Sequence, residues 1–275
     1  MSRLLRPASA GLAILLTCGV LAASDSAFAA AQPHTKSVAH SHPASHKTTT
    51  HKTTTHKSAK KPSAHKPVDK LAGARKGATH ALAAEAARVS RVAAAEAASA
   101  VLSPADKSAL QATTTAELKA LSADGTAVTA ATSGRAIQAA VQAGSRTAQA
   151  AQLQFQLVTL AARAQTAAAT LTTAATAVGD QAAAIAADGT DVSTVTTPLA
   201  DLAIQVSDAQ TSASAVASGA LTVPASPTAA QLHSANVSAR TGLTEAAVAL
   251  AAGNSDLATA TAALTALQAP PTDTP

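Results

Sequence analysis

The sequence is almost free of aromatic side chains: its 275 residues include two phenylalanines, no tryptophan and no tyrosine. Phe28 lies in a segment that we expect to be removed, which leaves Phe155 as the only aromatic residue of the mature chain. Grooves for single-stranded nucleic acids use aromatic side chains as stacking platforms, and small-molecule pockets are lined mostly by large apolar side chains. The composition therefore disfavours both kinds of site, whereas helices that pack through small side chains need no aromatic residue.

Cysteine and long hydrophobic runs are also scarce. The only cysteine, Cys18, precedes the expected cleavage site, so the mature chain would have neither a disulfide nor a reactive thiol. After the N-terminal region, no apolar stretch reaches 18 residues. We therefore expect no transmembrane segment in the mature chain.

Residues 1–29 have the layout of a secretory signal peptide. Arg3 and Arg6 come first, an apolar run covers 12–23, and the small-residue sequence Ala27-Phe28-Ala29 follows. About a dozen apolar residues are too few to span a bilayer. These features predict export from the cytoplasm. The sequence "LLTC" at Cys18 leaves lipidation as an alternative.

Charge divides the rest of the chain into two parts. Residues 30–76 carry ten lysines and arginines and one acidic residue, Asp69, whereas residues 77–275 carry eight basic and thirteen acidic residues. Residues 30–69 are rich in His, Lys, Thr, Ser and Pro and have few apolar side chains, so we expect a disordered, low-complexity basic arm. A solvated linker is the alternative to a binding function for this arm.

The arm offers two kinds of binding site. Its lysines would attract a polyanion such as an anionic cell-wall polymer, an acidic glycan or a nucleic acid, and binding would be salt-sensitive. The predicted polyanion-binding residues are Lys47, Lys52, Lys57, Lys60, Lys61 and Lys66. Seven of the nine histidines also lie here, and they would add positive charge below about pH 6.

A metal site is the rival interpretation of the arm. The unit HKTTT occurs at 46–50 and at 51–55, which places His46, His51 and His56 five residues apart. Histidine-rich tracts bind Zn, Cu or Ni, although this spacing forms no compact ligand set and the neighbouring lysines repel cations. The threonine runs could instead carry O-linked glycans.

Residues 70–269 are dominated by alanine, the strongest helix former. Within this region, apolar residues recur with alternating spacings of four and three, which is the pattern of a coiled-coil seam. The first seam consists of Leu153, Leu157, Leu160, Ala164, Ala167, Leu171, Ala174, Val178, Gln181 and Ile185. Further seams run from Val195 to Val216 and from Leu232 to Leu267.

Turn and cap signals divide this region into helices. "LSADGTAVT" at 121–129 and "IAADGTDVS" at 185–193 each predict a hairpin turn at Asp-Gly, with an unbroken rod as the alternative. Ser103-Pro104 and Ser226-Pro227 each predict an N-cap followed by proline at the first helical position. The resulting map has helices at 70–101, 104–122, 128–187, 194–218 and 227–268.

No catalytic motif is present. The chain has no Walker loop, dinucleotide-binding glycine pattern, nucleophile elbow or metalloprotease spacing. We expect the acidic residues to lie on polar, solvated helix faces, with Glu85 and Arg88 forming a surface pair. We therefore predict no enzyme activity, no catalytic residues, no cofactor and no small-molecule substrate.

The sequence predicts an all-α fold of long alanine-rich helices in an antiparallel coiled-coil or helical-bundle arrangement. A signal peptide (1–29) and the basic arm (30–69) precede this body (70–269), and a disordered tail (270–275) follows it. We expect a noncatalytic, secreted or cell-envelope-associated structural or interaction protein, held by its arm to an anionic surface and able to self-associate through its helices. An extracytoplasmic metal-binding protein that uses the histidines is the alternative. A nucleic-acid compacting protein with a histone-like tail is a third hypothesis, which the predicted export disfavours.

Overall fold

The computed structural model describes residues 70–269, and all of its regular elements are α-helices. Helices account for 89% of these residues and none lies in a strand, so the all-α prediction is confirmed for this part of the chain. The five helices are α3 (Lys70–Ala98), α4 (Pro104–Ala130), α5 (Gly134–Ala186), α6 (Ser193–Leu221) and α7 (Ala229–Gln268). The predicted signal peptide, arm and tail lie outside the described residues.

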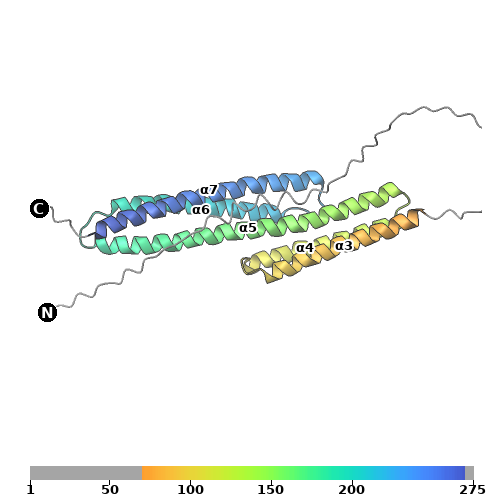
Figure 1. The fold of residues 1–275 in the computed structure, drawn as a ribbon, viewed down its shortest axis with the longest axis horizontal. Helices are drawn as coiled ribbons and strands as arrows, with labels where there is room; N and C mark the ends of the chain where they lie inside the picture. The colour runs from red at the N-terminus through yellow and green to blue at the C-terminus, as the bar shows by residue number, and fades with distance from the viewer. Residues whose placement is uncertain (1–69, 270–275) are drawn as a thin grey trace, which may run out of the picture. The chain divides into compact units, whose positions relative to one another are not determined.

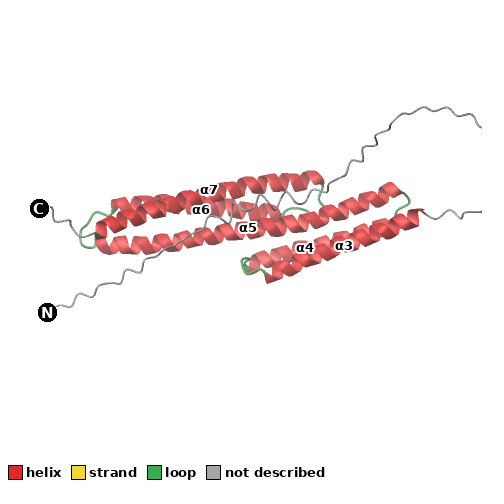
Figure 2. Ribbon diagram, in the orientation of Figure 1, coloured by secondary structure: helices red, strands yellow, loops and turns green. Residues whose placement is uncertain are grey.

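The 53-residue helix α5 is shared by two three-helix bundles (Figures 1 and 2). The first bundle consists of α3, α4 and the N-terminal half of α5, and the second consists of the C-terminal half of α5 with α6 and α7. At 1.5 Å per residue, α5 is about 80 Å long. Arg75, in the first turns of α3, donates hydrogen bonds to the carbonyl oxygen of Ala131, just after α4. Helices α3 and α4 therefore run in opposite directions.

The predicted seams lie in the core of the second bundle. Leu171, Leu202 and Leu250, one from each of its helices, are 1%, 2% and 6% exposed. Alanines occupy many of the remaining buried positions, which lets the helices approach closely. One seam position is wrong: Gln181 is exposed, and Ala182, four residues after Val178, is buried instead. The polar side chain of Gln181 stays in contact with water, and the small apolar side chain of Ala182 takes the buried position.

The capping prediction at α4 is confirmed, and the one at α7 is displaced by two residues. Ser103 caps α4 ahead of Pro104, and Asp106 completes a capping box. Near α7, however, the N-cap is Thr228 rather than Ser226, because Gln231 completes a capping box with Thr228. The capping box satisfies two free backbone N–H groups through reciprocal hydrogen bonds. Proline at the first helical position only removes one such group.

The two Asp-Gly motifs have different structures. The prediction at 185–193 is confirmed, since Gly189 has a φ of 84° in the connection between α5 and α6. The prediction at 121–129 is wrong, because α4 continues through Gly125 to Ala130. Leu121 and Val128, on either side of this glycine, are both buried. Their burial favours continuing the helix, and the turn forms instead ahead of Gly134, the first residue of α5, which Ser133 caps.

Candidate functional site

The residues that the sequence analysis assigned to binding lie outside the described residues. These are the six lysines, Lys47, Lys52, Lys57, Lys60, Lys61 and Lys66, and the three histidines, His46, His51 and His56. Within residues 70–269, the side chains with unusual chemistry are acidic and lie inside the first bundle.

Two glutamates are buried in the first bundle. Glu96, near the end of α3, is 1% exposed, and Glu117, in the middle of α4, is 0% exposed. The prediction that the acidic residues lie on solvated faces is therefore wrong for these two. Glu85, by contrast, forms the predicted pair with Arg88, with 3.7 Å between Oε2 and Nη1.

The two carboxyl groups have few hydrogen-bond partners. The Thr114 hydroxyl of α4 lies 3.0 Å from each carboxyl oxygen of Glu96 and 2.8 Å from the carbonyl oxygen of Leu110. A hydroxyl has one proton, so it can satisfy only part of this demand. Neither Oε1 nor Oε2 of Glu117 has a hydrogen-bond partner in the described part of the chain. A charge on Glu117 would therefore be buried without compensation.

Burial determines the protonation of this pair. Desolvation, with a smaller contribution from the charge of the nearby Glu96 carboxylate, raises the pKa of Glu117 to about 8. Desolvation also raises the pKa of Glu96, and the hydrogen bond from Thr114 opposes this rise. Glu117 is thus mainly an uncharged carboxylic acid at pH 7. A neutral acid avoids the large cost of a buried, unpaired charge.

This geometry limits the chemistry of the pair. General acid-base catalysis requires contact with a substrate, and both carboxyl groups are enclosed between helices. A metal site would need more ligands, and no group of three or more His, Cys, Asp and Glu within residues 70–269 is arranged to hold an ion. What the pair can do is bind or release a proton, and that event changes the charge inside the first bundle.

The three-four spacing places both glutamates at seam positions, together with the half-buried Glu85. On α3, Val89, Val92 and Glu96 follow the same three-four spacing as the leucine seams, and all three are buried. On α4, Glu117 lies three residues after Thr114 and four before Leu121, and these two are also buried. Large apolar residues make this spacing most conspicuous in the second half of the chain.

A second polar cluster links the two bundles. Arg146 of α5 donates a hydrogen bond from Nε to the carbonyl oxygen of Pro227, 3.0 Å away, in the connection between α6 and α7. Burial raises the pKa of Asp124 on α4, and the charge of Arg146 opposes that rise. Arg146 therefore interacts with one residue of the first bundle and with the α6–α7 connection at the same time.

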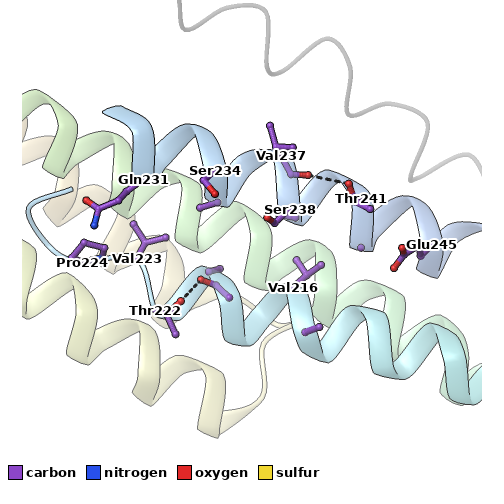
Figure 3. Close-up of a pocket in the computed structure, with 16 residues that line it drawn as sticks. Val216, Thr222, Val223, Pro224, Gln231, Ser234, Val237, Ser238, Thr241 and Glu245 are labelled. Carbon is purple, nitrogen blue, oxygen red and sulfur yellow. Dashed lines mark hydrogen bonds between the residues drawn. The ribbon is translucent and has the colours of Figure 1, made fainter. Parts of the chain in front are cut away.

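A groove of about 700 Å³ lies where α6 ends and α7 begins (Figure 3). Small and medium-sized side chains line it, among them Val216, Val223, Ser234 and Val237. Several of its polar groups already have local partners: the Thr222 hydroxyl donates to the Gly219 carbonyl and Gln231 caps α7. The groove is thus lined by apolar and small polar side chains, some of which are already hydrogen-bonded within the chain.

None of the helices within residues 70–269 combines the length and the hydropathy needed to cross a bilayer. Comparison with protein-family models, with curated proteins and with solved structures finds no match to this chain.

Proposed function

We propose that the protein is a noncatalytic, exported structural or interaction protein, in which the basic arm binds an anionic surface and the helical body acts as a spacer. The observation that carries this proposal is the placement of the two ends of the body along α5. The arm precedes α3, and α3 begins beside the end of α4, where α5 starts. Helix α7 ends beside the far end of α5 (Figure 1).

This placement separates the two ends by about the length of α5, on the order of 80 Å. Because a single helix runs through both bundles, no flexible linker between them has to be invoked. We further propose that the four-three seams pack as coiled coils, with alanine at many contact positions. A body of this kind would hold whatever its C-terminal end contacts at a defined distance from the start of α3.

The distribution of charge between the two bundles supports the assignment of the surface-facing end to the first bundle. Residues 70–149 carry nine lysines and arginines and five acidic residues, whereas residues 150–269 carry two arginines and seven acidic residues. A polyanion would attract the arm and the adjoining first bundle, and it would repel the second bundle. The second bundle would therefore point away from the surface that the arm binds.

Fractionation of cells that express the full chain tests the proposal. We expect a processed protein that remains with the envelope in low salt and is released by high salt, because screening weakens the attraction between charges. Release by a chelator alone would support the metal-binding hypothesis instead. An unprocessed protein found inside the cell would contradict the proposal.

Matched charge variants sharpen this test. One variant replaces Lys47, Lys52, Lys57, Lys60, Lys61 and Lys66 with glutamine. The control replaces six exposed basic residues of the helical body with glutamine: Lys70, Lys76, Arg91, Lys119, Arg135 and Arg163. Both variants lose the same charge. The arm variant should be released at much lower salt than the control, and equal release would show that net charge, rather than the arm, holds the protein.

A further inference from the structure

The buried polar side chains of residues 70–269 are confined to α3, α4 and the N-terminal half of α5. They are Glu96, Thr114, Glu117, Thr147 and Gln154. Thr147 donates to the Ala143 carbonyl and Gln154 donates to the Val223 carbonyl, so each has a partner for its donor. The Thr114 hydroxyl contacts Glu96 but not Glu117, and Glu117 has no hydrogen-bond partner among residues 70–269. The proton on Glu117 therefore controls whether this part of the core holds an unpaired charge.

We propose that Glu96, Thr114 and Glu117 form a proton-dependent latch, which keeps α3 and α4 packed on α5 while Glu117 is protonated and loosens them when it ionises. Glu117 lies in α4 between the buried side chains of Thr114 and Leu121, and Glu96 reaches the same interface from α3. A carboxylate formed here has to recruit water, and water can reach it only if the helices separate.

The basic side chains near the latch do not neutralise it. On α3, Arg88 binds Glu85 and donates to the side-chain oxygen of Gln152, while Arg91 is exposed. On α4, Lys107 donates to the carbonyl oxygen of Ala97, 3.1 Å away, and Lys119 is exposed.

The other elements near the latch supply no compensating charge either. On α5, Arg146 donates to the Pro227 carbonyl and interacts with the Asp124 carboxyl group of α4. The connection at residues 222–228 carries no charged residue. The group that acts on Glu117 through its charge is Glu96, which disfavours ionisation.

The opening should be confined to the first bundle. Most apolar side chains around α3 and α4 form one core cluster that includes Val89, Leu121 and Ala148, whereas Leu102 and Leu110 belong to the other cluster, which contains most of the second bundle. No carboxylate is among the buried residues described for α6 and α7. Ionisation of Glu117 therefore weakens the contacts of α3 and α4 and leaves the packing of α6 on α7 unchanged.

Hydrogen exchange measured by mass spectrometry on the full chain between pH 6 and pH 9 tests the latch, after correction for the intrinsic pH dependence of exchange. Amides of α3 and α4 should lose protection by about tenfold or more as the pH rises, whereas amides of α6 and α7 should not. Equal changes in all four helices, or no change in α3 and α4, would overturn the proposal.

Three variants locate the effect. Glu117→Gln keeps the shape and removes the charge, so α3 and α4 should stay protected up to pH 9. Glu245→Gln, at an exposed glutamate of α7, should retain the wild-type profile. Glu117→Met is the second neutral variant should the glutamine not be accommodated. If the neutral variants still loosen at high pH as the wild type does, Glu117 is not the latch.

Discussion

Gln154, in the middle of α5, donates a hydrogen bond from Nε2 to the carbonyl oxygen of Val223, 3.0 Å away and 69 residues later in the chain. The glutamine is 1% exposed and Val223 is 8% exposed, so the bond is sheltered from water. It joins the shared helix to the connection between α6 and α7, eight residues after Arg146 binds the same connection at Pro227. The two bonds define where the second bundle begins along α5.

Replacing this glutamine should weaken the second bundle. In Gln154→Met the side chain keeps its approximate size but cannot donate, and the Val223 carbonyl loses its side-chain partner. We expect a loss of about 1–2 kcal/mol in the free energy of unfolding, measured by urea denaturation of the full chain. Gln165→Met is the control, because Gln165 donates to Ser214 on an exposed face. A similar loss in both variants would mean that burial of the bond is unimportant.

The two Asp-Gly motifs should respond to alanine in opposite directions. Gly125 lies inside α4 with no atom within 4 Å of an added Cβ, so Gly125→Ala should stabilise the chain by about 1 kcal/mol through helix propensity. Gly189 has a φ of 84°, where an alanine is strained, and Gly189→Ala should destabilise it by about 1 kcal/mol. Thermal melts of the two variants decide this, and shifts of the same sign would contradict the assignment of only one motif as a turn.

These two motifs show why the sequence predicts helices better than their ends. Alanine content and four-three spacing are properties of long segments, so α5, α6 and α7 were predicted to within a few residues or, for the start of α5, within one or two turns. A turn signal such as Asp-Gly acts over a few residues, and tertiary burial can override it. At Gly125 the burial of Leu121 and Val128 overrode it, and at Gly189 no comparable burial opposed the turn.

The candidate site was harder to predict because charge is normally evidence of exposure. Glu96 and Glu85 lie on the same helix, yet the first is buried and the second forms a surface pair. Both lie on the three-four spacing of Val89 and Val92, Glu85 four residues before Val89 and Glu96 four residues after Val92, so the spacing alone does not distinguish them. Sequence patterns locate a seam, but which polar residues share it depends on packing between helices.

Close packing at Gly144 should make this glycine intolerant of a larger side chain. A Cβ at this position would overlap Leu82 of α3 and approach Leu121 of α4 to 3.1 Å. We expect Gly144→Ala to destabilise the first bundle by about 1–2 kcal/mol, despite the better helix propensity of alanine. Gly179→Ala is the matched control in the same helix, because its nearest neighbour is Leu199 at 3.8 Å, and it should be neutral or stabilising. Chemical denaturation that ranks the two in the reverse order would show that Leu82 moves aside without cost.

The leucines of the second bundle should account for much of its stability, because the alanines around them bury little apolar area. Leu171→Ala, Leu202→Ala and Leu250→Ala should each cost about 2–5 kcal/mol in the free energy of unfolding. Val248→Ala, at a side chain that is 64% exposed on α7, is the control and should change the melting temperature little. Indistinguishable melts for the leucine and valine variants would mean that the seam is not the core.

Stability of the whole chain should fall as the pH rises from about 5 to about 9. The folded state raises the pKa of Glu117 from 4.5 to about 8, so between these values the folded chain holds a proton that the unfolded chain has lost. The stabilisation is complete below the unfolded value and is lost as the pH passes the folded value. Each pKa unit corresponds to about 1.4 kcal/mol, which sets an upper bound of roughly 5 kcal/mol on the change. Urea midpoints measured across this range should decrease in the wild type and decrease less steeply in Glu117→Gln. Raised pKa values at Glu96 and Asp124 act in the same direction, so some slope will persist in the variant. A wild-type midpoint that rises with pH would show that Glu117 is ionised and solvated in the folded chain.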